Sequence, residues 1–171
     1  NLYDPKTGKY HGIDWDRERL TACRDQMFGG DMLALTEGYY RDVAAMADRR
    51  PAILGHIDLV TKLNRGNALF DEDDPRCRTA ALEALHHTDP DATLLEVNTG
   101  AISRGYRDTP YPAMFLLREW RSMGGQIILT ADAHSPETVV YGYGQAAELA
   151  RAAGFRECVL LTGRGWEPCP L

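Results

Sequence analysis

The sequence predicts an α/β fold in which a parallel β-sheet is covered by helices. Short apolar runs alternate with longer segments of helical periodicity, the pattern of successive strand and helix units. The runs are apolar along nearly their whole length, as expected of strands buried on both faces. Polar residues, among them His56, Asn98 and Asp132, follow the C-terminal ends of these strands. Barrels and open α/β sheets place their functional residues at that edge.

The boundaries of the elements follow from capping and turn residues. Residues 1–12 hold a D-P-K-T-G turn between aromatic residues and predict a loop or short hairpin outside the core. Asp14 or Asp16 is suited to cap the first helix, Asp31 the second, and Pro75 to begin the third. Helices are expected at residues 14–27, 31–48, 75–87, 112–123 and 145–153. Strands are expected at residues 52–55, 93–97, 126–130 and 158–161.

Length and composition narrow the class of protein. A chain of 171 residues with 44% hydrophobic content suits one domain, spanning residues 1–171. Its net charge of -6 and its lack of basic runs argue against nucleic acid as a partner. No apolar stretch approaches the roughly 20 residues of a membrane helix. The four cysteines are scattered, so we expect free thiols and a cytoplasmic location.

The strongest local signal for chemistry is the segment Thr130-Ala131-Asp132-Ala133-His134, at the end of a predicted strand. A carboxylate and an imidazole two residues apart supply oxygen and nitrogen ligands suited to Zn, Mn or Fe. Taken alone, the pair is more often a helix cap and a surface histidine. A second element, Gly55-His56-Ile57-Asp58, places another histidine at the same edge of the sheet and favours the metal site.

Several segments resemble a known family in order and spacing. They are GHIDLVTKLN, LLEVNTGAISRG, PYPAMFLLREW and ILTADAHSPETVVYGYG, with YDPKTGKYHGID and FGGD near the start. G-H-x-D and D-A-H mark the polymerase and histidinol phosphatase (PHP) superfamily. E-V-N-T-G with S-R-G, and D-A-H-S-P with Y-G-Y-G, are similar to its histidinol-phosphate phosphatase branch.

This resemblance implies the later strands and helices of a distorted seven-stranded, TIM-like β/α barrel that holds up to three divalent metals. It implies a cytoplasmic hydrolase of histidine biosynthesis that converts L-histidinol phosphate to L-histidinol and phosphate. His56, Asp132 and His134 match the family's ligand motifs, and Asp132 and His134 are also the expected catalytic residues. Arg104 and Lys62 are candidates to bind the substrate phosphate, because cationic side chains suit a dianion. The other reading of each is an exposed surface cation.

Neighbouring polar residues receive lesser roles. Asp58 is placed to orient Lys62 or a ligand, while Glu96 and Asn98 are expected to line the pocket or to contact the ligands. The remaining histidines are expected to be structural or exposed, with approach to substrate a minor alternative for the first of them: His11, His86 and His87.

One departure from the family is large. The N-terminal H-x-H motif and the ligands that precede the G-H-x-D strand are absent, and the chain begins at Asn1. We therefore expect an N-terminally truncated unit that is inactive alone and associates with a missing N-terminal segment or with a second copy. Two alternatives stay open: a PHP phosphoesterase for another small phosphorylated metabolite or nucleotide, and a metal-binding or interaction module without catalysis.

Overall fold

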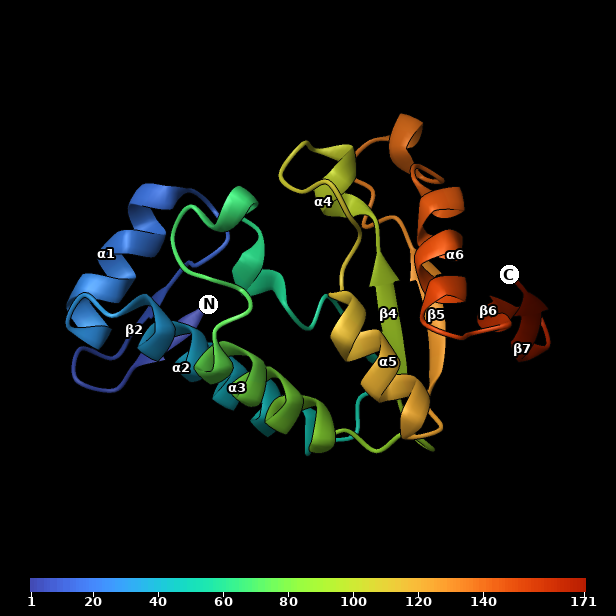
Figure 1. Ribbon diagram of the computed structural model, residues 1–171, viewed down its shortest axis with the longest axis horizontal. Helices are drawn as coiled ribbons and strands as arrows, with labels where there is room; N and C mark the ends of the chain where they lie inside the picture. The colour runs from blue at the N-terminus through green and yellow to red at the C-terminus, as the bar shows by residue number, and fades with distance from the viewer.

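The computed structural model describes residues 1–171, and Figure 1 shows its elements along the chain. The α-helices are α1 (Arg17–Phe28), α2 (Met32–Ala47), α3 (Pro75–His86), α4 (Gly100–Ser103), α5 (Met114–Ser122) and α6 (Tyr143–Ala152). The strands are β1 (Leu2–Asp4), β2 (Lys9–His11), β3 (Ile53–Leu54), β4 (Leu94–Asn98), β5 (Gln126–Thr130), β6 (Glu157–Thr162) and β7 (Gly165–Pro170). Short 3-10 helices cover Leu59–Thr61, Arg65–Asn67 and Pro136–Thr138. All five predicted helices are present, and α4 is an addition.

The central sheet has three parallel strands in the order β3-β4-β5. Ile53 pairs with Leu94, and Leu94 pairs with Gln126, so the three strands end at one edge, beside α4 (Figure 1). Leu95 and Ile127 lie opposite each other and are both fully buried. The predicted parallel α/β arrangement is confirmed. These strands form an open sheet, so the seven-stranded barrel stays a prediction.

Helix α5 is fixed to the sheet mainly by Trp120, which is fully buried. Its indole Nε1 donates a hydrogen bond of 2.8 Å to the carbonyl of Gln126 at the start of β5. The ring lies where a Cβ on Gly125 would be, only 2.1 Å from the ideal position. Glycine is therefore required at the turn between α5 and β5, since any side chain there would displace the indole.

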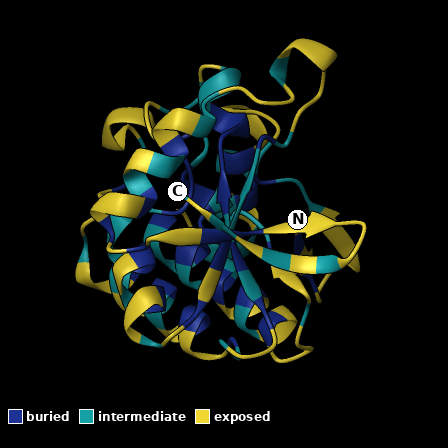
Figure 2. Ribbon diagram, turned by 90° about the vertical axis from the view of Figure 1, so that its right-hand side faces the viewer, coloured by how far each residue is buried: buried dark blue, intermediate teal, exposed yellow.

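The N-terminal half of the chain packs α1, α2 and α3 beside this sheet (Figure 1). Asp16 and Asp31 accept hydrogen bonds from the first turns of α1 and α2, so the second of the two predicted caps for α1 is the one used. A single cluster of 28 buried residues runs through both halves. Figure 2 shows buried positions at the centre and exposed positions on the outer faces of the helices.

The two ends of the chain differ from expectation. The N-terminal hairpin β1–β2 forms as predicted, but Leu2 is only 3% exposed and belongs to the core. The predicted strand at 158–161 lies in β6, yet β6 pairs antiparallel with β7 rather than joining the parallel sheet. Thr162 pairs with Gly165, so the two residues Gly163 and Arg164 turn the chain straight back. This tight turn, and not the apolar content of the strand, decides its partner.

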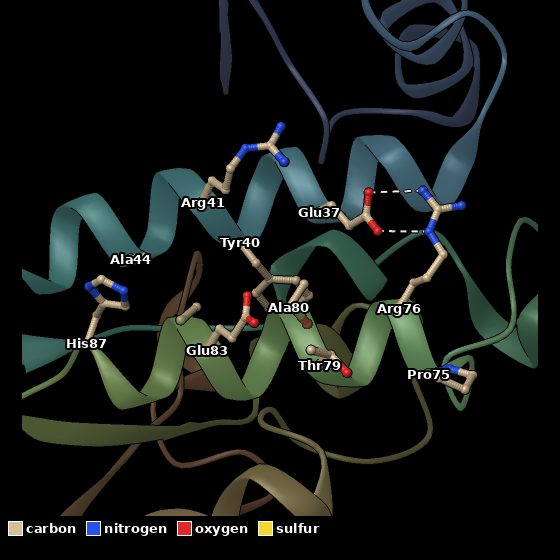
Figure 3. Close-up of a pocket in the computed structure, with 11 residues that line it drawn as sticks. Glu37, Tyr40, Arg41, Ala44, Pro75, Arg76, Thr79, Ala80, Glu83 and His87 are labelled. Carbon is tan, nitrogen blue, oxygen red and sulfur yellow. Dashed lines mark hydrogen bonds and ion pairs between the residues drawn. The ribbon is translucent and has the colours of Figure 1, made fainter.

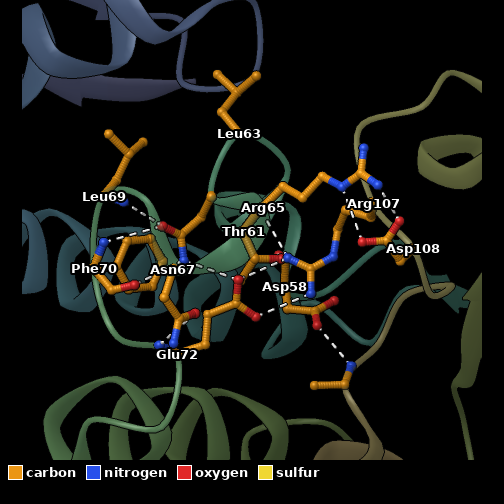
Figure 4. Close-up of polar contacts among 12 residues, drawn as sticks. Asp58, Thr61, Leu63, Arg65, Asn67, Leu69, Phe70, Glu72, Arg107 and Asp108 are labelled. Atoms are coloured by element: carbon orange, nitrogen blue, oxygen red, sulfur yellow. Dashed lines mark hydrogen bonds and ion pairs between the residues drawn. The ribbon is translucent and has the colours of Figure 1, made fainter.

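Polar contacts hold the loop between β3 and α3 (Figure 4), and the buried Asn64 makes several of them. The Asn64 carbonyl oxygen accepts from the backbone N–H groups of Leu69 and Phe70, and its amide donates to Phe70 O and to Glu72. The Glu72 carboxylate also accepts hydrogen bonds from both terminal nitrogens of Arg107, at 2.9 and 3.1 Å. Because Asn64 is fully buried, these bonds are strongly required, and they fix the loop that carries Lys62.

None of the helices has the length and apolar character needed to span a bilayer.

Candidate active-site cleft

A cleft of about 630 Å³ lies at the C-terminal edge of the parallel sheet. It is lined by Asp14, Trp15, Asp16, His56, Leu59, Lys62, Arg104, Tyr106, Asp132 and His134. All five residues that the sequence singled out for metal or phosphate binding are in this group. Their loops follow three successive parallel strands, which is how the sheet brings residues 78 positions apart, such as His56 and His134, to one cavity.

Two of the predicted residues have unusual backbone conformations. His56 has φ 27° and Asp132 has φ 45°, both in the left-handed region that non-glycine residues seldom adopt. Each stands two positions after the last residue of its strand. Aspartate and histidine tolerate this region better than most residues, and such strain gathers at functional sites. The backbone thus independently marks the two strand ends that the sequence motifs indicated.

Glu96 joins the ends of all three strands beneath the cleft. One carboxylate oxygen, Oε2, accepts from the backbone N–H of His56 at 2.6 Å and from the amide of Asn98 at 3.1 Å. The other, Oε1, accepts from the hydroxyl of Thr130 at 2.6 Å. Gly55 eases the close approach, because its ideal Cβ would lie 3.1 Å from Oε2 and would make the carboxylate shift by a few tenths of an ångström. Glu96 therefore holds His56 through its backbone, which refines its expected role beside the ligands.

Arg104 connects the two other predicted ligands. Its Nη2 donates to Asp132 Oδ2 at 2.8 Å, and its Nη1 donates to the carbonyl of Asp132 at 2.8 Å and to His134 Nδ1 at 2.9 Å. His134 Nδ1 also lies 2.8 Å from the carbonyl oxygen of Asp132, so Arg104, Asp132 and His134 form one compact polar cluster. Gly100 makes room for the cluster, since a Cβ there would lie 2.7 Å from Asp132 Oδ2. Arg104 is thus no free surface cation.

Lys62 is likewise held in place, with its side chain only 14% exposed. Its Nζ donates to the backbone carbonyl of Asp14 at 2.7 Å and lies 3.7 Å from the Asp14 carboxylate. The ammonium also lies 4.8 Å from the ring centre of Tyr106, within the range of a cation–π contact. These contacts fix the ammonium between the N-terminal loop and the segment after α4.

Asp58 and Asn98 depart from their expected places. Asp58 does not orient Lys62, because its Oδ2 accepts from the backbone N–H of Ala113 at 2.8 Å while its Oδ1 has no partner. Burial raises the pKa of this carboxyl to about 6, and the Ala113 hydrogen bond opposes the rise. Asn98 is 1% exposed and lies below the cleft, with its Oδ1 accepting from Gly100 N. Both side chains support the site without lining it.

The other histidines lie outside the cleft, in agreement with their structural reading. His11 Nε2 is 4.0 Å from the carboxylate of Asp4, so it does not approach the candidate site. His86 and His87, at the end of α3, contact carboxylates on other elements, at 2.7 and 2.9 Å. They join α3 to α5 and to the end of α2.

The donor set can be tested for a metal by its chemistry and spacing. Asp132 Oδ1 and His134 Nδ1 lie 3.9 Å apart. Two ligand atoms bound to one tetrahedral ion at about 2.1 Å would lie about 3.4 Å apart, so a small adjustment would suffice. No three His, Cys, Asp or Glu side chains yet form a group ready to hold a metal. The residues fit as part of a site in which Arg104 contacts His134 Nδ1 and the other carboxylate oxygen of Asp132, Oδ2.

Five residues of the cleft were not anticipated: Asp14, Trp15, Asp16, Leu59 and Tyr106. The first three follow one another in H-G-I-D-W-D, where an acidic pair beside an exposed tryptophan was the available signal. On its own, this pattern predicts only a helix cap at Asp14 or Asp16. Asp16 does cap α1, so capping and cleft lining occur together.

Comparison with known proteins adds no relative: the chain matches no protein-family profile and shows no significant similarity to a curated protein. The case for the site thus rests on its geometry.

A second groove, of about 520 Å³, lies between α2 and α3 (Figure 3). There Arg76 and Glu37 form a bidentate ion pair at one end, and alanines lie along the helices. It contains none of the residues that the sequence indicated for metal or phosphate binding, and its charged pair is already satisfied.

Proposed function

We propose that this chain forms the metal-binding part of a phosphomonoesterase similar to the PHP histidinol-phosphate phosphatases. One observation carries the proposal: residues chosen from two short motifs and two nearby cations line one cleft at the end of a parallel sheet. His56, Asp132 and His134 would hold divalent metal, namely Zn, Mn or Fe. Bound metal would supply an activated water and offset negative charge on the phosphoryl oxygens.

The chain's own cations and carboxylates have separate tasks in this proposal. Arg104 keeps its Nε–H and one Nη2–H outside the bonds described above, and these can donate to a substrate phosphate. Lys62 would add a second cation from the opposite loop. Asp14 and Asp16 place negative charge in the same cleft, which favours a substrate that carries both a phosphate and a cationic amine. L-Histidinol phosphate has both groups, whereas a nucleotide lacks the aliphatic amine.

The fold proposal is that β3, β4 and β5 belong to a larger distorted barrel. Strand β3 pairs with β4 alone, and Ile53 on it is 36% exposed, so its outer edge is free to pair with further strands. A missing N-terminal segment, or a second copy of the chain, is the proposed partner on that edge. We propose a cytoplasmic, small-molecule enzyme, with neither nucleic acid nor membrane as a partner.

The test compares the 171-residue chain with the protein encoded by the whole reading frame. Each would be loaded with Zn or Mn and assayed with histidinol phosphate, a nucleoside monophosphate and a sugar phosphate. We expect turnover of histidinol phosphate by the complete protein, little by the 171-residue chain, and severe loss in Asp132→Asn and His134→Ala. Arg164→Ala, far from the cleft, serves as the control. Full activity in both cleft variants would refute the site, and preference for another ester would favour the alternative phosphoesterase.

A further inference from the structure

The C-terminal hairpin brings two cysteines opposite each other. Cys158 on β6 pairs with Cys169 on β7 in the antiparallel register. Directly opposed residues in an antiparallel pair extend their side chains to the same face of the sheet. Cys158 is 5% exposed and part of the core cluster, and Cys169 packs against that cluster while partly exposed. Ten residues separate the two cysteines in the sequence, so no C-x-x-C motif indicates that they form a pair.

The register also fixes the kind of pairing. The tight turn closes on Thr162 and Gly165, and closing pairs of two-residue hairpins exchange hydrogen bonds. Every second pair along the ladder is then hydrogen-bonded, which includes Cys158 with Cys169. The alternate pairs, which are not hydrogen-bonded, include those of Pro168 and Pro170. Proline has no N–H to donate, so these positions agree with the alternation. Hydrogen-bonded pairs have Cα atoms about 5.5 Å apart, inside the range of about 4.4–6.8 Å that a disulfide spans. Their Cβ atoms lie about 5.5 Å apart, farther than the roughly 3.5–4.5 Å of a disulfide, so closing the bond draws the two strands closer together.

The two thiols influence each other. Burial raises the pKa of the Cys158 thiol, and the neighbouring Cys169 raises it further. Cys23 has a different neighbour, since its thiol contacts the sulfur of Met27 at 3.6 Å. Cys23 and Cys77 are both buried on helices and have no cysteine across a ladder. All four cysteines are free, as expected from their scattered positions.

We propose that Cys158 and Cys169 form a reversible disulfide when the protein meets a disulfide oxidant such as oxidised glutathione. The more exposed Cys169, as thiolate, attacks one sulfur of glutathione disulfide and releases one glutathione. The Cys158 thiolate then attacks the Cys169 sulfur of this mixed disulfide and releases the second glutathione. Two protein thiols and one glutathione disulfide become one protein disulfide and two glutathione thiols, and the protons pass to the released thiolates.

The bond would fasten the outermost strand of the domain. Strand β7 pairs only with β6, and β6 packs against β5, the strand that leads to Asp132. In the reduced protein, the hairpin opens when the hydrogen bonds between β6 and β7 break. In the oxidised protein, the disulfide keeps the two strands joined in a closed loop even when those hydrogen bonds break. The proposed modification therefore controls how readily the C-terminal edge of the sheet frays, with the thiols as the sensor.

The experiment incubates the full 171-residue chain with excess oxidised glutathione and then blocks free thiols in denaturant. We expect two of the four thiols to be lost, with no glutathione adduct and a mass about 2 Da lower when the chain is weighed before blocking. Trypsin cleaves after Arg156 and Arg164, so the two cysteines fall on separate peptides, residues 157–164 and 165–171, which should appear linked. Dithiothreitol should restore four thiols.

Variants separate this bond from other oxidation. Cys169→Ser should remove the linked peptide pair, and Cys77→Ser, the matched control, should keep it. Amide hydrogen exchange in residues 157–170 should slow on oxidation of the wild type and stay unchanged in Cys169→Ser. Four free thiols after oxidation, a stable glutathione adduct on Cys169, or a link that grows with protein concentration and joins two chains would each overturn the proposal.

Discussion

Replacement of Arg104 by methionine should strengthen the binding of a divalent metal. In the structure Arg104 donates to the two side-chain atoms, Asp132 Oδ2 and His134 Nδ1, at 2.8 and 2.9 Å, so the guanidinium holds ligands that a metal would need. Methionine fills similar space without charge or donors. The expected change is a lower metal dissociation constant, which is the opposite of what loss of a metal ligand would give.

The magnitude follows from the two bonds that a metal must displace. A hydrogen bond to a charged group contributes about 1.5–3 kcal/mol when it is buried. The side chains of Arg104 and Asp132 are 27% and 35% exposed, and that of His134 is 69% exposed, so solvent screening reduces each bond to about 0.5–1 kcal/mol. Together they contribute about 1–2 kcal/mol, which corresponds to roughly a five- to thirtyfold gain in metal affinity.

Calorimetric titration with Mn or Zn measures the dissociation constant directly. Arg65→Met is the matched control, because Arg65 also forms a bidentate ion pair, with Asp108, outside the cleft. It makes the same change in net charge without freeing Asp132. The same Arg104→Met variant should bind inorganic phosphate more weakly, since the phosphate loses its guanidinium partner. Equal or weaker metal binding in Arg104→Met, or an equal gain in the control, would refute the reasoning.

Three further predictions concern stability, measured by urea unfolding. Glu96→Leu leaves the His56 backbone N–H and the Asn98 amide without their acceptor and should cost about 1–3 kcal/mol, while an unchanged midpoint would contradict the role of Glu96 in joining the strand ends. Asp58 has its pKa raised to about 6 from 3.8, so the folded state binds more protons and stability falls as pH rises from about 4 to 6. Asp58→Asn should therefore be more stable than wild type at pH 7.5, by up to about 3 kcal/mol, but not at pH 3.5, and equal differences at both pH values would contradict this. Gly125→Ala should lose about 1–3 kcal/mol through displacement of the buried Trp120 indole, whereas Gly144→Ala, whose Cβ meets nothing within 4 Å, should not.

The parallel sheet could be predicted because its evidence is local. A short apolar run indicates each strand, and the polar residue that follows it marks the carboxyl edge of the sheet, independently of the length or sequence of the loops. The fate of β6 could not be read in this way, since its apolar run is also compatible with a parallel strand. Pro168 and Pro170 were the available signal: alternate prolines are typical of an edge strand and do not continue a central sheet.

The cleft was predictable in part for a related reason. Motifs at strand ends located His56 and Asp132, but not the N-terminal loop that meets them. Asp14 reaches Lys62 over 48 positions in sequence, and no periodicity encodes such a contact. The sequence suggested that Arg104 binds the substrate phosphate or is an exposed surface cation, but did not show its bonds to Asp132, which depend on the turn after β5 and on the absence of a side chain at Gly100.

The conformations of the two strand ends explain why their neighbours matter. Left-handed backbone at a non-glycine residue costs about 1–3 kcal/mol and persists only where surrounding contacts enforce it. At His56 the contact is the Glu96 carboxylate on the backbone N–H, and at Asp132 it is Arg104 on both the carbonyl and the carboxylate. Both contacts are made by protein groups alone. The cleft is therefore preorganised before any ligand arrives, and Arg104 both stabilises the turn at Asp132 and competes for its carboxylate.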